Sequence, residues 1–139
     1  MHNIVVDASV VLAWFEEGNQ AELALTIHDD ILKGNVSACA PGFLLLETAN
    51  ICYRRKKLSQ LEIEAILRNI SSIWINYNDT PLTVEMEHIV SLVIQHRISA
   101  YDAQYLHLAQ KLNCKLVSFD KELLRIKDWV IAPGKLVSK

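Results

Sequence analysis

The stretch IVVDASVVLAW, residues 4–14, places a short apolar run directly before an aspartate and a second apolar segment. The run IVV is continuous rather than alternating in polarity, which is typical of a strand buried on both faces of a parallel sheet. We interpret ASVVLAWF, which follows Asp7, as a helix leading away from that strand. Strand, aspartate and helix together predict the opening of an α/β fold.

Four later segments have the same continuous apolar character as this first strand. They are VSACA (36–40), WINY (74–77), KLVSF (115–119) and WVIA (129–132). Helical patterns lie between them, so the predicted order is βααβααβααβαβ. Helical crossovers between successive strands indicate a three-layer α/β/α sandwich with a mostly parallel, open sheet of about five strands.

Several helix boundaries are marked by residues that commonly start or end helices. Gly34 is a plausible C-cap, Pro41 is expected to open a helix over residues 43–57, and Ser99 is expected to start another. Ser59 with Glu62 forms a capping-box pattern.

Length and composition predict one globular domain spanning residues 1–139, with 51% hydrophobic residues. The 14 basic and 16 acidic side chains give a formal charge of -2, so a polyanion partner would need a local patch or a metal. Cys39, Cys52 and Cys114 form no Cys-x-x-Cys pair and are interpreted as free thiols in a reducing compartment. Without a convincing signal peptide or membrane span, we expect a cytoplasmic protein and no membrane partner.

Two aspartates, Asp7 and Asp120, follow predicted strands. Ligands gather at the carboxyl ends of strands in such sheets, so both are candidate site residues. Each is also placed to cap the helix that follows it, although Ser9 could cap the first helix instead.

Two more carboxylates lie in early turns of predicted helices. Asp102 fits a capping box with Ser99, which is an alternative to a ligand role. Glu47 sits in the nearly apolar start of its helix with no basic residue three or four positions away, so a buried Glu47 would need a partner. An exposed flank of the helix is the alternative for Glu47.

The four carboxylates together favour a metal site. Carboxylates gathered at one sheet edge repel one another unless they are protonated or neutralised by a divalent cation. Oxygen ligands of this kind select Mg²⁺ or Mn²⁺ rather than zinc. Such a site can activate a water for hydrolysis of a phosphodiester.

The segments VVDASV, LLETAN, SAYDAQYLHLA and LVSFD resemble the acidic signatures of the PIN-domain family, particularly the toxin ribonucleases of VapBC-type toxin–antitoxin pairs. The resemblance covers nearly the whole chain. It implies a Mg²⁺- or Mn²⁺-dependent endoribonuclease that cleaves RNA with a metal-activated water. It also implies a small cognate antitoxin protein and a homodimer held by helices of the first half.

Site residues follow from the same resemblance. Asp7, Glu47, Asp102 and Asp120 match the catalytic and metal-binding carboxylates, with Asp7 and Asp102 the strongest candidates for direct ligands. The supporting hydroxyls are those of Ser9, Ser99 and Ser118. Ser118 stands where threonine is more frequent, and Lys121 where arginine is frequent; both departures bear on substrate choice.

Other features have two interpretations each. The basic run of Arg54, Arg55, Lys56 and Lys57 could bind RNA phosphates. Alternatively, its positive charges could interact favourably with the dipole at the C-terminal end of its helix. Tyr53 and Tyr101 could stack on bases or pack in the core or at its rim. Trp14 and Phe15 could belong to a dimer face or to the core.

Two other functions compete with a nuclease. A phospho-accepting receiver domain also uses strand-end aspartates and magnesium, but the paired helical crossovers and the positions of Glu47 and Asp102 argue against it. A catalytically silent PIN-like interaction module is the second alternative. It would bind no metal.

Overall fold

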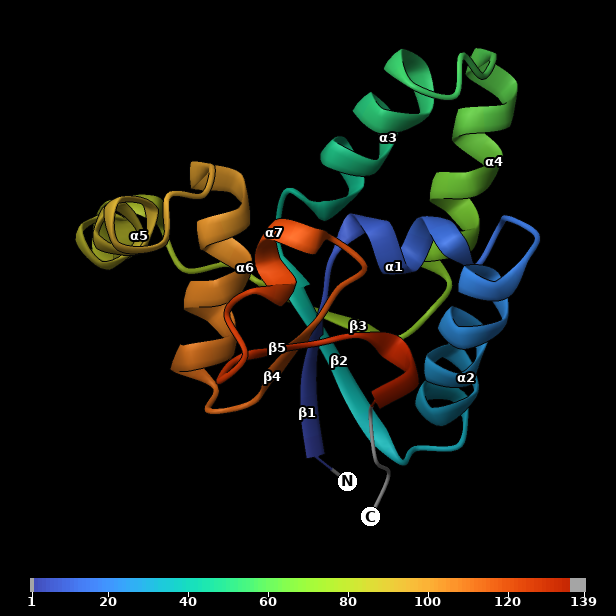
Figure 1. Cartoon of the computed structure of the whole chain (residues 1–139). Coiled ribbons are helices and arrows are strands. Elements are labelled where there is room, and N and C mark those ends of the chain that lie inside the picture. Colours follow the sequence, from blue (N-terminus) through green and yellow to red (C-terminus); the bar gives the residue numbers. More distant parts are fainter. Residues whose placement is uncertain (1, 136–139) are drawn as a thin grey trace.

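The computed structural model describes residues 2–135 and contains one five-stranded sheet. The strands are β1 (His2–Val6), β2 (Val36–Pro41), β3 (Ile75–Asn78), β4 (Lys115–Val117) and β5 (Val130–Ile131). Their order across the sheet is β3-β2-β1-β4-β5, and every pairing is parallel (Figure 1). The predicted parallel α/β sheet is therefore confirmed.

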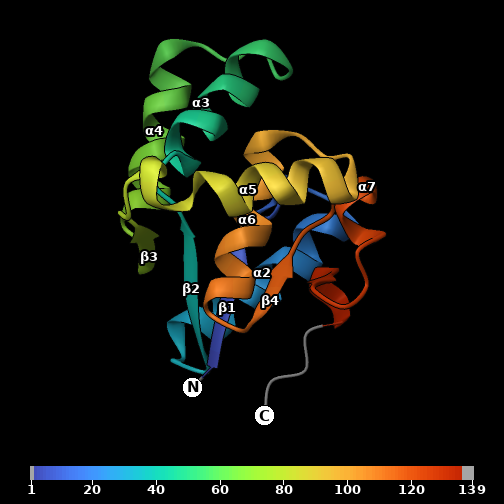
Figure 2. The ribbon, with the colours of Figure 1, turned by 90° about the vertical axis from the view of Figure 1, so that its left-hand side faces the viewer.

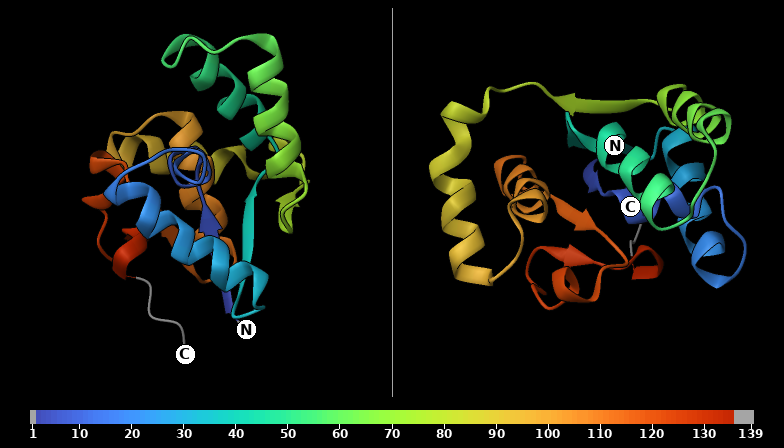
Figure 3. Two further views of the ribbon diagram at one scale, coloured as in Figure 1. Left: turned by 90° about the vertical axis from the view of Figure 1, so that its right-hand side faces the viewer. Right: turned by 90° about the horizontal axis from the view of Figure 1, so that it is seen from above.

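Helices connect the strands in the predicted order. They are α1 (Ala8–Ala13), α2 (Asn19–Leu32), α3 (Leu44–Arg54), α4 (Gln60–Ser71), α5 (Leu82–His96), α6 (Ala100–Lys111) and α7 (Lys121–Leu124), followed by a short 3-10 helix at Pro133–Lys135. The helices α5 and α6 lie on one side of the sheet and α1 and α2 on the other (Figure 3). Two layers of helices thus enclose the strands, as a sheet that is apolar on both faces requires.

The helices α3 and α4 pack on each other and extend past the carboxyl ends of the strands (Figure 1, Figure 2). Because α3 starts shortly after β2, its first turn stays close to the sheet edge. Glu47 lies in that first turn.

The core is built from the strands and the faces of the helices that cover them. Ile4, Val5 and Val6 of β1 are fully buried because β1 is the middle strand. Ile27 of α2 and Leu106 of α6 are buried over opposite faces. No helix in the described part of the chain is long and apolar enough to cross a membrane.

Three helix boundaries test the sequence predictions. The Ser59–Glu62 capping box is present, and Gly34 adopts a left-handed φ of 75° just after the end of α2. The prediction for Pro41 was wrong: it is the last residue of β2, and α3 begins at Leu44. Its fixed φ suits the end of a strand as well as the first turn of a helix, so the sequence does not distinguish the two.

The predicted free thiols are confirmed: Cys39 and Cys52 are buried, Cys114 is half-buried, and none forms a disulfide. Trp14 is a core residue, with its indole N–H donating to the carbonyl of Ala24 at 2.9 Å, whereas Phe15 is 38% exposed. Core packing therefore accounts for Trp14 but not for Phe15.

A polar cluster joins α5 to α6. Glu85 is buried, and Lys111 Nζ and His107 Nε2 lie 2.8 and 2.9 Å from its Oε2. Asn78 Nδ2 donates to Glu85 Oε1 at 3.0 Å. The end of β3 and both helices are thus tied to one buried carboxylate.

Candidate active site

The four predicted carboxylates border one cleft of about 490 Å³ at the carboxyl edge of the sheet. The residues that line this acidic cleft and carry the argument below are Asp7, Ser9, Glu47, Arg55, Lys56, Ser99, Asp102, Tyr105 and Asp120. They lie in α1, α3 and α6, at the junction of β1 with α1, directly after α3, and directly before α6 and α7. Residues more than 110 positions apart in the chain therefore face the same space.

Asp7 occupies the inner end of the cleft, where β1 passes into α1. It is only 6% exposed, and it is the N-cap of α1, accepting a hydrogen bond from the Val10 backbone N–H at 3.2 Å. Burial raises its pKa to about 6, and the nearby Glu47 carboxylate adds to the effect. Hydrogen bonds from Ser118, Ser9 and Val10 oppose that rise. Asp7 is therefore both a cap and a carboxylate whose charge is costly without a cation.

Two hydroxyls hold the Asp7 carboxylate. Ser9 Oγ donates to Asp7 Oδ1 at 2.6 Å, and the fully buried Ser118 Oγ donates to Oδ2. The same hydroxyls accept backbone hydrogen bonds, Ser9 from Phe119 at 3.1 Å and Ser118 from Asp120 at 2.9 Å. The alternative that Ser9 caps α1 is wrong, because Asp7 is the cap and Ser9 orients it. Serine at position 118 supplies the required hydroxyl.

The sequence predicts that a buried Glu47 needs a partner, and the structure provides one. That partner is a hydroxyl group rather than a basic side chain. The hydroxyl of Tyr105 on α6 donates to Glu47 Oε1 at 2.7 Å. Partial burial raises the pKa of Glu47, as does the charge of Asp102, while Tyr105 and Arg55 act in the opposite direction. Glu47 is half-buried rather than on an exposed flank.

Tyr105 was not among the residues singled out from the sequence. It is 1% exposed, and its pKa is raised by burial and by the surrounding carboxylates Glu47, Asp7 and Asp102. One signal could have identified it: Tyr105 follows Asp102 by three residues, so the two lie on neighbouring positions of one helix face.

Asp102 and Asp120 close the other side of the cleft. Ser99 caps α6 by accepting from the Asp102 backbone N–H at 3.0 Å. The reciprocal bond, from the Ser99 backbone N–H to the Asp102 carboxylate, does not form, so only half of the predicted capping box is present. Asp120 caps α7, accepting from Glu122 at 2.8 Å and Leu123 at 3.1 Å. Burial raises the pKa of Asp102, and the charge of Asp120 raises it further.

The donor set fits a hard divalent cation. None of the four carboxylates forms a salt bridge with any residue of the described range 2–135. Within that range no three Asp, Glu, His or Cys side chains converge closely enough to count as a preformed metal site. The carboxylates border a common cleft with uncompensated charge, and oxygen donors of this type suit Mg²⁺ or Mn²⁺.

The four residues of the basic run differ in whether they line the acidic cleft. Arg55 and Lys56 line it, whereas Arg54 donates through Nε to Asn50 on α3 at 3.1 Å. Lys56 forms a salt bridge with Glu16 at 3.2 Å. Neither Arg55 nor Lys57 makes a side-chain hydrogen bond or salt bridge to any described residue, and of these two only Arg55 lines the cleft.

Tyr53 and Tyr101 are 69% and 63% exposed, so core packing does not explain either of them. Only Tyr101 borders the acidic cleft.

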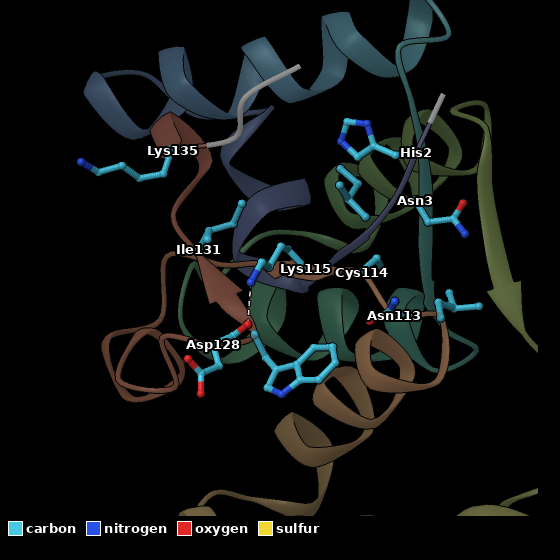
Figure 4. A pocket seen from close by; sticks show the side chains of 11 residues that line it. His2, Asn3, Asn113, Cys114, Lys115, Asp128, Ile131 and Lys135 are labelled. Carbon is cyan, nitrogen blue, oxygen red and sulfur yellow. Dashed lines mark hydrogen bonds between the residues drawn. The ribbon is translucent and has the colours of Figure 1, made fainter. Parts of the chain in front are cut away.

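A second cleft, of about 510 Å³, lies at the amino ends of β1 and β4 (Figure 4). His2, Asn3, Lys115 and Trp129 are among its lining residues, and Lys115 Nζ donates to the Asp128 carbonyl at 2.5 Å. Its single carboxylate, that of Asp128, contrasts with the four of the acidic cleft.

Fold and site together define a class: three-layer α/β proteins with a carboxylate cleft at the carboxyl edge of a parallel sheet. Residues 4–128 match the family model described as PIN domain. The chain therefore belongs to the PIN domain family, as the resemblance in the four acidic segments implied.

Individual relatives agree with this assignment. The chain is 25% identical over 126 residues to ribonuclease VapC3 from Pyrobaculum aerophilum, covering 86% of this chain and 91% of that protein. Its fold matches the crystal structure of Mycobacterium tuberculosis VapC20, described as a sarcin-ricin loop cleaving toxin, with a TM-score of 0.67, 16% identity and coverage of 88% and 94%. VapBC2 from Rickettsia felis, solved bound to a promoter DNA fragment, matches with a TM-score of 0.66, 14% identity and coverage of 92% and 96%.

Proposed function

We propose that this protein is a metal-dependent endoribonuclease and the toxin of a toxin–antitoxin pair. The observation that carries the proposal is the acidic cleft, which Asp7, Glu47, Asp102 and Asp120 all border and in which none of them forms a salt bridge with a residue of the range 2–135. Family membership and the ribonuclease and toxin names of the relatives support the same function.

In this proposal the four carboxylates hold Mg²⁺ or Mn²⁺. When bound, the cation would supply Lewis acidity for the attack of water on a phosphodiester. Ser9 and Ser118 fix both oxygens of Asp7, so that carboxylate keeps one orientation when a substrate enters. Ser99 fixes the first turn of α6 and with it the position of Asp102.

Substrate binding needs positive charge beside the acidic cleft, because the chain as a whole carries a formal charge of -2. Arg55 borders the cleft and has no partner in residues 2–135, so we assign it the phosphate contact. Lys56 is already neutralised by Glu16, and Arg54 is held by Asn50. Lys57 does not line the cleft, so in this proposal the contribution of the basic run is concentrated at Arg55.

The partners of the proposed function are an RNA substrate, a small antitoxin protein and a second copy of the chain. The VapBC2 relative supports an antitoxin partner. The exposed side chain of Phe15 is available for a homodimer face.

The test measures cleavage of a structured RNA pool by the purified protein with Mg²⁺, Mn²⁺ or chelator. Asp102→Asn is expected to retain the fold, because asparagine is tolerated near a helix start, and to lose cleavage. Asp128→Asn, in the second cleft, is the matched control and should cut normally. Full activity of a folded Asp102→Asn protein would refute the site, and a wild type that binds no metal would favour the silent interaction module.

A further inference from the structure

Tyr105 makes a contact that joins two helices across the acidic cleft. Its hydroxyl donates to Glu47 Oε1 at 2.7 Å, linking α6 to α3 over 58 residues of sequence. The side chain is 1% exposed, although it ends in a polar group. A hydroxyl this deeply buried needs a hydrogen-bond partner, and here that partner is one of the proposed metal-binding carboxylates.

The ring of Tyr105 is anchored beside the same turn of α3. It packs edge-on against Phe43, with ring centroids 5.4 Å apart and planes at 70°. Phe43 is the N-cap of α3, and its carbonyl accepts from the Glu47 backbone N–H at 2.9 Å. Tyr105 therefore touches this turn at two points, the ring at Phe43 and the hydroxyl at Glu47.

The bond also differentiates the two oxygens of Glu47. Within the described residues the Tyr105 hydroxyl is the only hydrogen-bond donor to the Glu47 side chain, and it uses Oε1 alone. A phenol has one proton and donates one such bond. Oε2 has no hydrogen-bond donor among the described residues, and Glu47 lines the same cleft as the other three carboxylates.

We propose that Tyr105 is a positioning residue for the acidic cleft: its hydroxyl fixes the Glu47 carboxylate and leaves Oε2 as the oxygen that would be free to bind a divalent cation. The inference rests on the proposed metal-dependent function and extends it to a residue outside the four carboxylates. Hydrogen bonds that orient metal ligands commonly change metal affinity or activity by about 10- to 100-fold when they are removed.

The experiment measures Mn²⁺ affinity by titration calorimetry in wild type, Tyr105→Phe, Glu47→Ala and the double variant. Tyr105→Phe keeps the ring against Phe43 and deletes only the hydroxyl. We expect it to weaken Mn²⁺ binding about 10-fold. In the Glu47→Ala background the same change should have no further effect, because the hydroxyl acts through that carboxylate. Urea unfolding in chelator reports separately on stability.

The control is Tyr77→Phe, which removes a tyrosine hydroxyl from β3, away from the acidic cleft, and should leave Mn²⁺ affinity unchanged. Unchanged affinity in Tyr105→Phe would overturn the inference and reduce Tyr105 to a core residue. An equal loss in both backgrounds would also overturn it, since Tyr105 would then act by another route. Absence of Mn²⁺ binding by the wild type would instead refute the proposed metal site itself. The experiment therefore distinguishes failure of the proposed function from failure of the inference about Tyr105.

Discussion

Replacement of Asp7 by Asn is expected to stabilise the metal-free protein at neutral pH, although Asp7 is the N-cap of α1. Asparagine caps helices as well as aspartate does, so the bond to the Val10 backbone N–H can be kept. What the substitution removes is a negative charge at a site that is only 6% exposed. The charge, rather than the cap, should therefore decide the sign of the effect.

The size of the effect follows from the pKa of Asp7, which burial raises from 3.8 to about 6 in the folded protein. Between these two pH values the unfolded chain has lost the proton while the folded chain still holds it. The free energy of unfolding of the wild type thus falls as the pH rises through this window and levels off above it. At about 1.4 kcal/mol for each pH unit the loss amounts to about 3 kcal/mol, which the Asn variant avoids.

The assay is urea unfolding of both proteins from pH 4 to pH 8 in chelator, where the difference in unfolding free energy should grow towards about 3 kcal/mol. Adding Mn²⁺ at about 100 times its Kd should return about 2.7 kcal/mol to the wild type alone. Parallel pH curves in chelator would refute the reasoning, because Asp7 would then keep its ordinary pKa on folding.

Three further predictions concern other residues. Arg55→Ala should raise KM for RNA in a cleavage assay, whereas Lys57→Ala, outside the acidic cleft, should not. Burial raises the pKa of Glu85, but contacts with Lys111 and His107 outweigh it and set the pKa at about 2. The contribution of the Glu85 carboxylate to the free energy of unfolding should therefore be complete above pH 4.5 and should decline as the pH falls towards 2. In thermal unfolding scans from pH 2 to 6, the Glu85→Gln variant should lack that decline. Ser118→Ala should cost about 1–3 kcal/mol in urea unfolding, more above pH 6 than below, because the ionised Asp7 depends most on its donors.

The sequence predicts the elements of this protein well because each carries its own local signal. Continuous apolar runs mark the strands, and Ser59 and Ser99 mark the starts of α4 and α6. The predicted helix start at Pro41 was wrong because the backbone conformation of proline suits the end of a strand as well as the start of a helix.

The candidate site is predictable only in part. Asp7 and Asp120 could be placed at one edge, since the carboxyl ends of parallel strands share it. The pairing of Tyr105 with Glu47 and of Glu85 with His107 depends on which helices pack together. That packing is set by the whole sheet, so no local pattern reveals it.

The position of β1 has a consequence for how the protein acquires activity during synthesis. This strand precedes the other four in the chain, yet it lies between β2 and β4, and the hydrogen bond from Ser118 to Asp7 spans 111 residues. A nascent chain cannot complete this contact until the segment through Ser118 has left the ribosome. Pairings over such long sequence separations also form slowly. Any truncated product that stops before β4 therefore lacks the assembled site, and translation itself delays the appearance of a functional enzyme.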